Sequence, residues 1–496
     1  EHASDETLQK QQPKSDLPPS IFYQLTLAEI AAQRGQMDIA IANYVDAAKK
    51  TLDPKVAERA TQMSVYAQDM ANALSSSALW VEVDGENPES HRTRAAILLK
   101  IGRAADAVAE YEKMIELMPG EEARAYNIIV SHLSREPDHS VSLAVMERLV
   151  ESRPDNAQVL FAYAHLAMRH AKFDTALVTL DKVLALEPSW ADAVILRARI
   201  MAMQGDRDAA LAYLKESLKG DLANDFNVRN SYARMLTEVR QFEEALDQFE
   251  ILAKQEPTSG ETHYLAGILA LQLKKNDLAE KYLIKVLEIG RQRTMEANYY
   301  LAQIAELDEN MEEAIERYSM VRRGELYFNA QVRIVALLAD AKEYEEARVH
   351  LQTINAVSEK QQVQLYLLEG DILREAKRYE DAKQFYTTIL TRFPEQTNIR
   401  YARALIAEKL GDLQLVESDL LTILEVEPEN AQVLNALGYT LADRTDRYQE
   451  ALQYIQKALD LEPEDAAVMD SMGWVNYRLG NYEEALLHLR KANEMA

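Results

Sequence analysis

The sequence predicts an all-α protein, a right-handed α-solenoid superhelix of about fourteen tandem helix pairs. Three observations lead to this fold class. Small residues recur at intervals of 31 to 36 residues, prolines recur with a similar period, and glycine is scarce, with 15 residues in 496. A period near 34 residues is typical of antiparallel helix pairs that bury their apolar faces only by stacking on their neighbours. We therefore expect one long scaffold rather than several globular domains.

The small residues form a ladder that runs through the whole periodic region. Its rungs are Ala40, Ser76, Ala107, Ser142, Ala176, Ala210, Ala245, Ala279, Ala314, Ala347, Ala382, Val416, Ala451 and Ala485. A large side chain often follows four residues later, as at Tyr44, Trp80, Tyr111, Phe249, Tyr318 and Tyr386. Residues four apart share one face of a helix. The rung should therefore let the two helices of a pair approach closely, and the large side chain should fill the groove beside it.

Prolines and acids mark the ends of the predicted helices. Nine of the thirteen prolines lie near the ends of the units, at Pro54, Pro88, Pro119, Pro154, Pro188, Pro257, Pro394, Pro428 and Pro463. Proline disfavours helix in the residue before it, which separates one pair from the next. Acid pairs recur at the start of the second helix, at Glu243/Glu244, Glu345/Glu346 and Glu483/Glu484. The helix dipole favours acids there, so we interpret them as solvated helix starts and not as catalytic carboxylates.

The domain organisation follows from the extent of the ladder. Residues 1–20 contain three prolines and few large apolar residues, which predicts a disordered leader or tether, with Ser20 as the cap of the first helix. Residues 21–496 should form one continuous solenoid. The terminal proline is missing near 220–225, 290–294 and 322–327, where we expect either soft joints or plain drift of the repeat. The last unit ends the chain, so we also expect a polar C-terminal cap to be missing.

Composition limits the partners. The formal net charge of −26 argues against nucleic acid, which needs a basic patch, and against direct contact with an anionic membrane surface. The absence of cysteine excludes disulfides and cysteine-based zinc sites. No run of eighteen apolar residues occurs, so no segment is expected to span a bilayer. The sequence does not fix an oligomeric state.

The sequence offers no constellation for catalysis. It has no HExxH motif and no glycine-rich phosphate loop, and its nine histidines are scattered. His165 and His170 are five residues apart, which places them on different faces of a helix. We predict a non-enzyme without a cofactor or a metal site.

From about residue 21 to 496 the repeat pattern resembles the tetratricopeptide superfamily. Three segments, 17–44 (LPPSIFYQLTLAEIAAQRGQMDIAIANY), 324–347 (GELYFNAQVRIVALLADAKEYEEA) and 435–486 (beginning NALGYTLADRTDRYQEAL), also resemble a group of proteobacterial repeat proteins. Many members of that group are outer-membrane lipoproteins that face the periplasm. The best understood resemble adaptors that bind a carboxyl-terminal processing protease and present substrates to it. The resemblance implies that residues 1–20 are a tether following a lipid-modified cysteine, and that the membrane is reached only through that lipid.

In such repeats, partners usually lie against positions 2, 5, 9 and 12 of the first helix. Near the C-terminal end the candidate protein-binding residues are Asn435, Tyr439, Asp470, Trp474, Tyr477 and Arg478. Aromatic side chains with a polar tip and arginine are common anchors of binding hot spots. The alternative is that Trp474 and Tyr439 pack against an adjacent helix or a capping helix.

A second candidate stripe lies in the middle of the chain. It consists of Asn227, Asn230, Arg234, Tyr264, Tyr299, Tyr300 and Gln303. Asparagine side chains there could hydrogen-bond the backbone of an extended peptide. The set of lysines, arginine and asparagines with which chaperone-binding repeat proteins hold two carboxylates does not occur in three consecutive units, so chaperone C-termini are not expected partners.

The resemblance therefore implies a non-catalytic adaptor, located at the periplasmic face of the outer membrane, that binds a carboxyl-terminal processing protease and its substrates. One alternative is a scaffold for envelope export or secretion machinery. Another is a cytoplasmic interaction protein that regulates or delivers substrate to a transferase.

Overall fold

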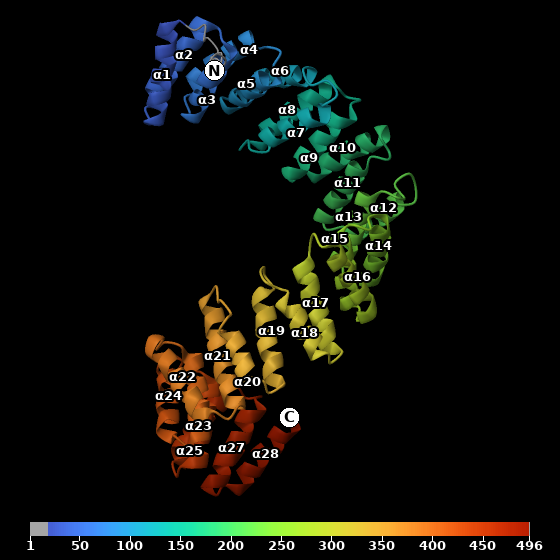
Figure 1. Cartoon of the computed structure of the whole chain (residues 1–496). Helices are drawn as coiled ribbons and strands as arrows, with labels where there is room; N and C mark the ends of the chain where they lie inside the picture. Colours follow the sequence, from blue (N-terminus) through green and yellow to red (C-terminus); the bar gives the residue numbers. More distant parts are fainter. Residues whose placement is uncertain (1–17, 496) are drawn as a thin grey trace, which may run out of the picture. The chain divides into compact units, whose positions relative to one another are not determined.

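The computed structural model describes residues 18–495, which form twenty-eight α-helices and no strand. Consecutive helices form fourteen pairs, and we call the first helix of each pair helix A and the second helix B. The predicted α-solenoid of tandem helix pairs is confirmed (Figure 1). Of the leader expected at residues 1–20, residues 1–17 lie outside the described part, and Pro19 and Ser20 belong to the first helix.

The helices divide into two units, one up to Gln255 and one from Glu256. The first unit contains α1 (Pro19–Gln33), α2 (Met37–Thr51), α3 (Pro54–Tyr66), α4 (Met70–Val83), α5 (Pro88–Lys100), α6 (Ala104–Glu116), α7 (Glu122–Leu133), α8 (His139–Ser152), α9 (Ala157–Arg169), α10 (Phe173–Leu186), α11 (Ala191–Met203), α12 (Arg207–Ser217), α13 (Phe226–Glu238) and α14 (Phe242–Gln255).

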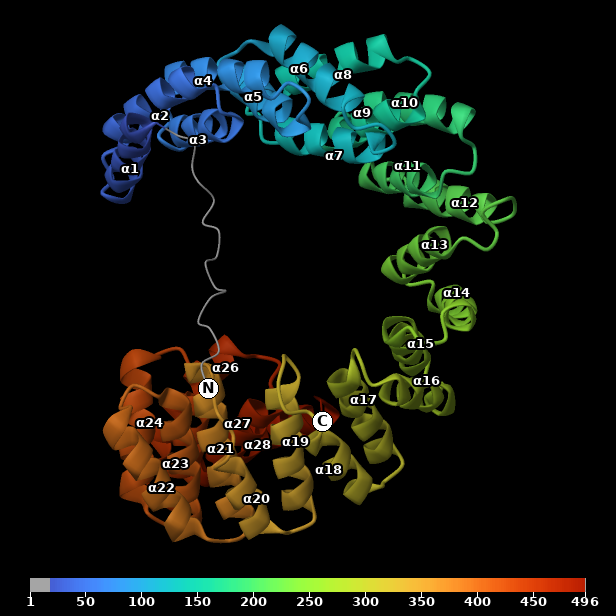
Figure 2. The same ribbon diagram turned by 45° about the horizontal axis from the view of Figure 1, so that its top comes forward.

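The second unit contains α15 (Gly260–Gln272), α16 (Asn276–Ile289), α17 (Thr294–Leu307), α18 (Met311–Ser319), α19 (Tyr327–Asp340), α20 (Tyr344–Leu351), α21 (Glu359–Glu375), α22 (Tyr379–Arg392), α23 (Thr397–Leu410), α24 (Leu413–Val426), α25 (Ala431–Arg444), α26 (Tyr448–Leu461), α27 (Ala466–Leu479) and α28 (Tyr482–Met495). Within each unit successive helices lie side by side in chain order (Figure 2).

The ladder predicted from the sequence forms the core. All fourteen rungs are buried, and eleven of them are alanines. The large side chains four residues later are buried as well: Tyr44, Trp80, Tyr111, Phe249, Tyr318 and Tyr386 are each at most 4% exposed. In four pairs a helix A glycine completes the fit. A Cβ added to Gly438 would lie 2.5 Å from Ile455 Cγ1, and one added to Gly473 would lie 2.6 Å from Leu489 Cγ. Both added carbons would overlap the facing helix B, so glycine sets the close approach there.

The first helix begins earlier than expected. α1 begins at Pro19, Ser20 lies inside it, and its N-cap Pro18 makes no side-chain hydrogen bond. The prediction that Ser20 caps this helix is therefore wrong. Proline has a fixed φ suited to the first helical turn and lacks the amide hydrogen that would otherwise need a partner there, so it starts the helix without a cap.

Two of the three predicted joints follow a shortened helix B. Helix B is 11 residues long in α12, 9 in α18 and 8 in α20, against 13 to 15 in the other pairs. The loops after α12 and α18 are those at 220–225 and 322–327, whereas α16, before the loop at 290–294, has its full 14 residues. The loop after α20, at 352–358, was not predicted. Whether these joints are soft stays a prediction.

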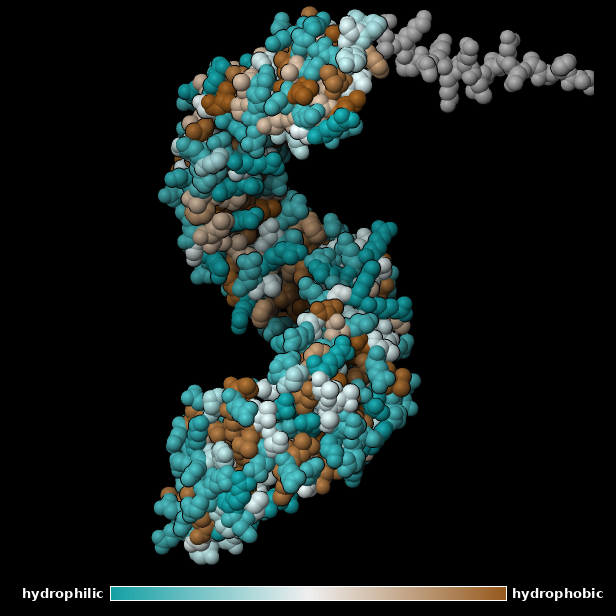
Figure 3. Space-filling view, turned by 90° about the vertical axis from the view of Figure 1, so that its left-hand side faces the viewer, coloured by the Kyte–Doolittle hydropathy of each residue, from teal (hydrophilic) through white to brown (hydrophobic). Residues whose placement is uncertain are grey.

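The face of the molecule seen in Figure 3 is mostly hydrophilic, with separate hydrophobic patches. Within residues 18–495, no helix combines the length and the apolar character needed to cross a bilayer.

Acid is expected to destabilise the first unit through His132. Burial, with Arg92 and Arg135 nearby, lowers the pKa of His132 to about 4. The unfolded chain then binds a proton at higher pH than the folded chain does, near the ordinary histidine pKa of about 6.5. The free energy of unfolding should therefore fall as the pH drops from about 6.5 to about 4. Urea unfolding across this range should show a smaller decrease for His132→Gln, and an identical decrease would contradict this assignment.

Candidate protein-binding surfaces

Helix caps and glycines fix the C-terminal candidate residues. Asn430 accepts a hydrogen bond from the amide of Val433 (3.1 Å) and starts α25, and Asp465 accepts one from Val468 (2.9 Å) and starts α27. Gly438 and Gly473 turn one side of these helices toward helix B. The residue after each glycine, Tyr439 or Trp474, therefore occupies the same place in successive repeats, and Asn435 and Asp470 correspond in the same way.

Trp474 belongs to an aromatic cluster on α26, α27 and α28, which we call the C-terminal aromatic cluster and which comprises Tyr448, Trp474, Tyr477, Arg478 and Tyr482. The rings of Trp474 and Tyr477 stack at 5.6 Å, and those of Tyr477 and Tyr482 lie 5.7 Å apart. The Arg478 guanidinium lies 4.8 Å from the Tyr448 ring centroid and 5.8 Å from that of Trp474, and it donates to Tyr448 Oη at 2.6 Å. The cluster thus contains the ring types and the arginine that anchor many protein interfaces.

Some side chains of the C-terminal aromatic cluster pack against the core, and others are exposed to solvent. Trp474 is half-buried and packs against the hydrophobic core formed by α23 to α27, whereas Tyr477 is 51% exposed. The Trp474 Nε1 atom is buried and has no acceptor among the described residues. Packing against an adjacent helix, the alternative raised from the sequence, therefore holds for part of the Trp474 ring, while Tyr477 and Tyr482 stay accessible.

Asn435 and Tyr439 lie in a neighbouring hollow of about 330 Å³ formed with α23. Its other side is formed by Tyr401, Leu405 and Glu408. Burial, followed by the carboxylates of Asp443, Asp470 and Glu408, raises the pKa of Tyr439. Glu408 is the acid among the residues that line the hollow, and Arg444 nearby opposes the effect of the carboxylates on the pKa of Tyr439. The six C-terminal candidates lie on two adjacent A helices, in two adjoining groups.

The middle stripe is divided by the unit boundary. Asn227 and Arg234 are exposed and Asn230 is half-buried on α13, which belongs to the first unit. Tyr264 on α15 and the α17 residues Tyr299, Tyr300 and Gln303 belong to the second unit. The structure brings the three tyrosines together: the rings of Tyr299 and Tyr300 are 5.4 Å apart, and those of Tyr264 and Tyr300 are 6.3 Å apart.

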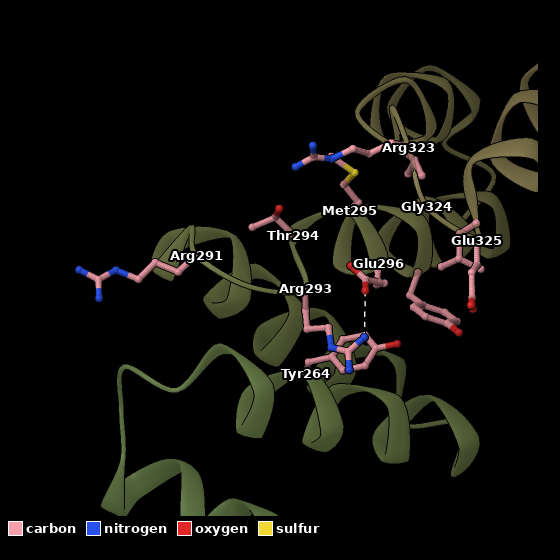
Figure 4. Close-up of a pocket in the computed structure, with 12 residues that line it drawn as sticks. Tyr264, Arg291, Arg293, Thr294, Met295, Glu296, Arg323, Gly324 and Glu325 are labelled. Atoms are coloured by element: carbon pink, nitrogen blue, oxygen red, sulfur yellow. Dashed lines mark hydrogen bonds and ion pairs between the residues drawn. The ribbon is translucent and has the colours of Figure 1, made fainter. Parts of the chain in front are cut away.

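Beside these tyrosines lies a hollow of about 660 Å³ that the sequence reasoning missed (Figure 4). It is bordered by the loop before α17 and the loop before α19, and Arg291, Arg293 and Arg323 are among its lining residues. The sequence feature that could have pointed to this hollow is the absence of the terminal proline at both joints. That absence marks loops that differ from those of the regular repeat. The sequence could not show that the two loops lie side by side.

The histidines of residues 18–495 are not gathered into a metal site. His170 stacks on His139, with ring centroids 3.9 Å apart, and not on His165. Among residues 18–495 no group of three or more histidine, aspartate or glutamate side chains is placed to hold a metal ion. The recurrent acids make structural contacts: Glu244 accepts from Lys215 (2.7 Å) and from the Tyr232 hydroxyl (2.6 Å).

The chain belongs to the tetratricopeptide repeat family. The family model matches residues 164–225, 234–294, 367–415, 417–466 and 440–495. A TPR repeat-containing protein of Pseudomonas aeruginosa is 34% identical over 494 residues, which covers 99% of this chain and 83% of the relative. Anaphase-promoting complex subunit 7 of Mus musculus is 22% identical over 195 residues, 39% of this chain and 34% of that protein.

Solved structures of similar fold include the anaphase-promoting complex hetero-tetramer Cut9–Hcn1, with a TM-score of 0.32, 13% identity and coverage of 96% of this chain and 94% of that chain. A tetratricopeptide repeat protein from Parabacteroides merdae has a TM-score of 0.33, 18% identity and coverage of 50% and 98%. As a tetratricopeptide repeat protein, the chain is a scaffold for protein–protein interaction, and the family match indicates no enzyme family.

Proposed function

We propose that this chain is an adaptor at the periplasmic face of the outer membrane that binds a carboxyl-terminal processing protease and delivers substrates to it. The observation that carries the proposal is the C-terminal aromatic cluster. It lies in the segment 435–486, whose sequence resembles proteobacterial adaptors of this kind, and it presents Tyr477 and Tyr482 to solvent beside the Arg478 guanidinium. The resemblance also supports a lipid anchor ahead of residues 1–20 as part of the proposal.

The cluster is suited to a partner that covers the exposed rings. Tyrosine and tryptophan bury a large area at a low cost in side-chain entropy and keep one polar atom for a hydrogen bond. The Trp474 indole N–H makes no hydrogen bond in this structure, so a shift of the ring toward a partner would break none. Glu408, which lines the hollow beside Tyr439, could pair with a basic side chain of the same partner.

An adaptor of this kind needs no bond-making residue. Holding protease and substrate on one scaffold raises the concentration of one near the other, to the millimolar range for short tethers. Cleavage then becomes faster without any change in the chemistry of the protease.

The experiment is a pull-down from a bacterial envelope extract with three chains, read by mass spectrometry. They are the unchanged chain, Trp474→Ala/Tyr439→Ala, and the control Tyr23→Ala/Tyr66→Ala, which removes two tyrosines that are 70% and 74% exposed in the first unit. We expect the unchanged and control chains to retain a carboxyl-terminal processing protease. Loss of two hot-spot residues, each contributing about 2 kcal/mol, should reduce retention more than tenfold.

The purified protease then provides the functional test. We expect the unchanged chain to accelerate cleavage of a substrate protein and the double variant to lose most of that acceleration. Equal retention of the protease by all three chains would show that the binding surface does not lie on α25–α28. Enrichment of export or secretion components without any protease would replace the adaptor by an envelope scaffold, and cytoplasmic partners alone would refute the periplasmic location.

A further inference from the structure

The hollow before α17 and α19, which we call the arginine hollow, has a local charge opposite to that of the whole chain. Three arginines, Arg291, Arg293 and Arg323, line it with two glutamates, Glu296 and Glu325, while the chain carries a formal charge of −26. Arg322 adjoins it in the same loop. Because charges are screened beyond about 8 Å at physiological salt, the charged side chains that line the hollow, with arginines in excess by one, matter more for binding there than the distant acids.

These arginines differ in their pairing. The Arg293 guanidinium donates to Glu261 at 2.8 Å and to Glu296 at 3.0 Å, and it lies 5.2 Å from the Tyr264 ring centroid. Figure 4 shows Arg293 paired with Glu296 beside Tyr264. Arg291 and Arg323 are exposed and have no ion pair within the described part of the chain. One cation is thus fixed in place, and two on facing loops are available to an outside anion.

The two loops that border the hollow depart from the repeat pattern. Both lack the terminal proline, α18 ends after 9 residues, and Arg293 has a φ of 59° as the N-cap of α17. The Arg293 guanidinium that follows from this loop lies over the Tyr264 ring.

The floor of the hollow is aromatic and firmly held. Tyr264 and Tyr300 line it, Tyr299 stands edge-on to Tyr300 and lies 5.4 Å from the Tyr318 ring, and Tyr318 donates to Glu306 at 2.5 Å. Tyr318 is only 1% exposed. An apolar side chain entering beside Met295 would therefore meet a surface that is already ordered.

From these contacts we infer that the arginine hollow binds an acidic, aromatic-containing segment of a partner protein. Carboxylates of the segment pair with Arg291 and Arg323, and an apolar side chain packs on Tyr300 and Met295. The hollow lies in the loops between repeats and not on the helix A surface of α25 and α27, so it is a second site. This inference rests on the protein-binding part of the proposed function and is independent of the protease.

Fluorescence polarisation with a labelled peptide of alternating glutamate and phenylalanine tests the inference on the full chain. Two further probes are the same peptide with glutamine for glutamate, and vesicles that contain phosphatidylserine. Arg291→Glu/Arg323→Glu changes the hollow. Lys274→Glu/Lys275→Glu makes the same change in net charge at the other end of α16, about 20 Å away by helix rise, with both lysines exposed.

We expect the acidic peptide to bind the unchanged chain, and the arginine variant to bind it at least about tenfold more weakly because like charges then face each other. The lysine variant should differ by less than about twofold, since screening removes its effect at that distance. The glutamine peptide should bind weakly to every chain. No binding to the unchanged chain, equal losses in the two variants, or binding of the vesicles but not the peptide would overturn the inference.

Discussion

Asp419→Ala is expected to lower the free energy of unfolding of the second unit by about 3–5 kcal/mol, the usual cost of leaving a buried charge unpaired. Asp419 on α24 is 1% exposed and accepts two hydrogen bonds from Arg403, at 2.8 and 2.6 Å, and one from Arg400 at 3.4 Å. Arg403 also donates to Thr387 on α22 at 3.1 Å. This network links three consecutive helices, and removal of its only anion leaves two nearly buried arginines.

Hydrogen-exchange mass spectrometry should locate the effect. A repeat scaffold is stabilised by neighbouring contacts, so exchange should accelerate in α22–α24 and their neighbours while the first unit is unchanged. Asp381→Ala is the matched control, because Asp381 pairs with Arg378 at 2.6 Å but its side chain is 55% exposed. An exposed pair contributes about 0–1 kcal/mol. Similar losses in the two variants would show that burial of Asp419 is not what makes its ion pairs strong.

Trp80→Ala is expected to destabilise the first unit by about 3–5 kcal/mol, as large core truncations do. Trp80 is 1% exposed, four residues after the rung Ser76, and belongs to the core cluster that joins α1 to α4. Removing the indole leaves a cavity that the flanking helices cannot fill, because each is already held by its own neighbours.

Urea unfolding followed by tryptophan fluorescence is the measurement for this variant. Trp190 then reports the first unit and Trp474 the second, since the chain contains three tryptophans. Trp190→Ala is the control, because Trp190 is half-buried and packs mainly on Phe161 at 4.6 Å. We expect the Trp80 variant to lower only the transition seen by Trp190. A change in the Trp474 transition of similar size would mean that the two units unfold together.

The repeat made much of the fold predictable from sequence. Residues equivalent to Ala451 are buried in every unit. The period of 34 or 35 residues places each of them in the same environment of its helix pair. For the same reason Tyr439 and Trp474 could be placed at equivalent helix A positions before any coordinates were known. The start of α1 at Pro19 was missed because the cap rule gave Ser20 a role that proline makes unnecessary.

The arginine hollow could not be predicted because it depends on contacts between segments that the periodicity does not describe. Arg291 and Arg323 lie in different loops, and only the short helix α18 and the course of the chain after Gly290 bring those loops to one hollow. The loop at 352–358 was missed for a related reason: its sequence contains neither proline nor glycine, the usual signals of a break. Departures from a repeat are thus harder to predict than the repeat itself.

The second unit has unlike chemistry at its two ends, which gives the scaffold a direction. Arginines gather beside α17, and the acids Glu408, Asp443 and Asp470 surround Tyr439 near its last helices. A polypeptide lying along successive repeats would have its acidic end drawn to the first of these places and its basic end drawn to the other. Reversing it would oppose like charges at both ends, so binding at both places would select the orientation of an extended partner as well as its composition.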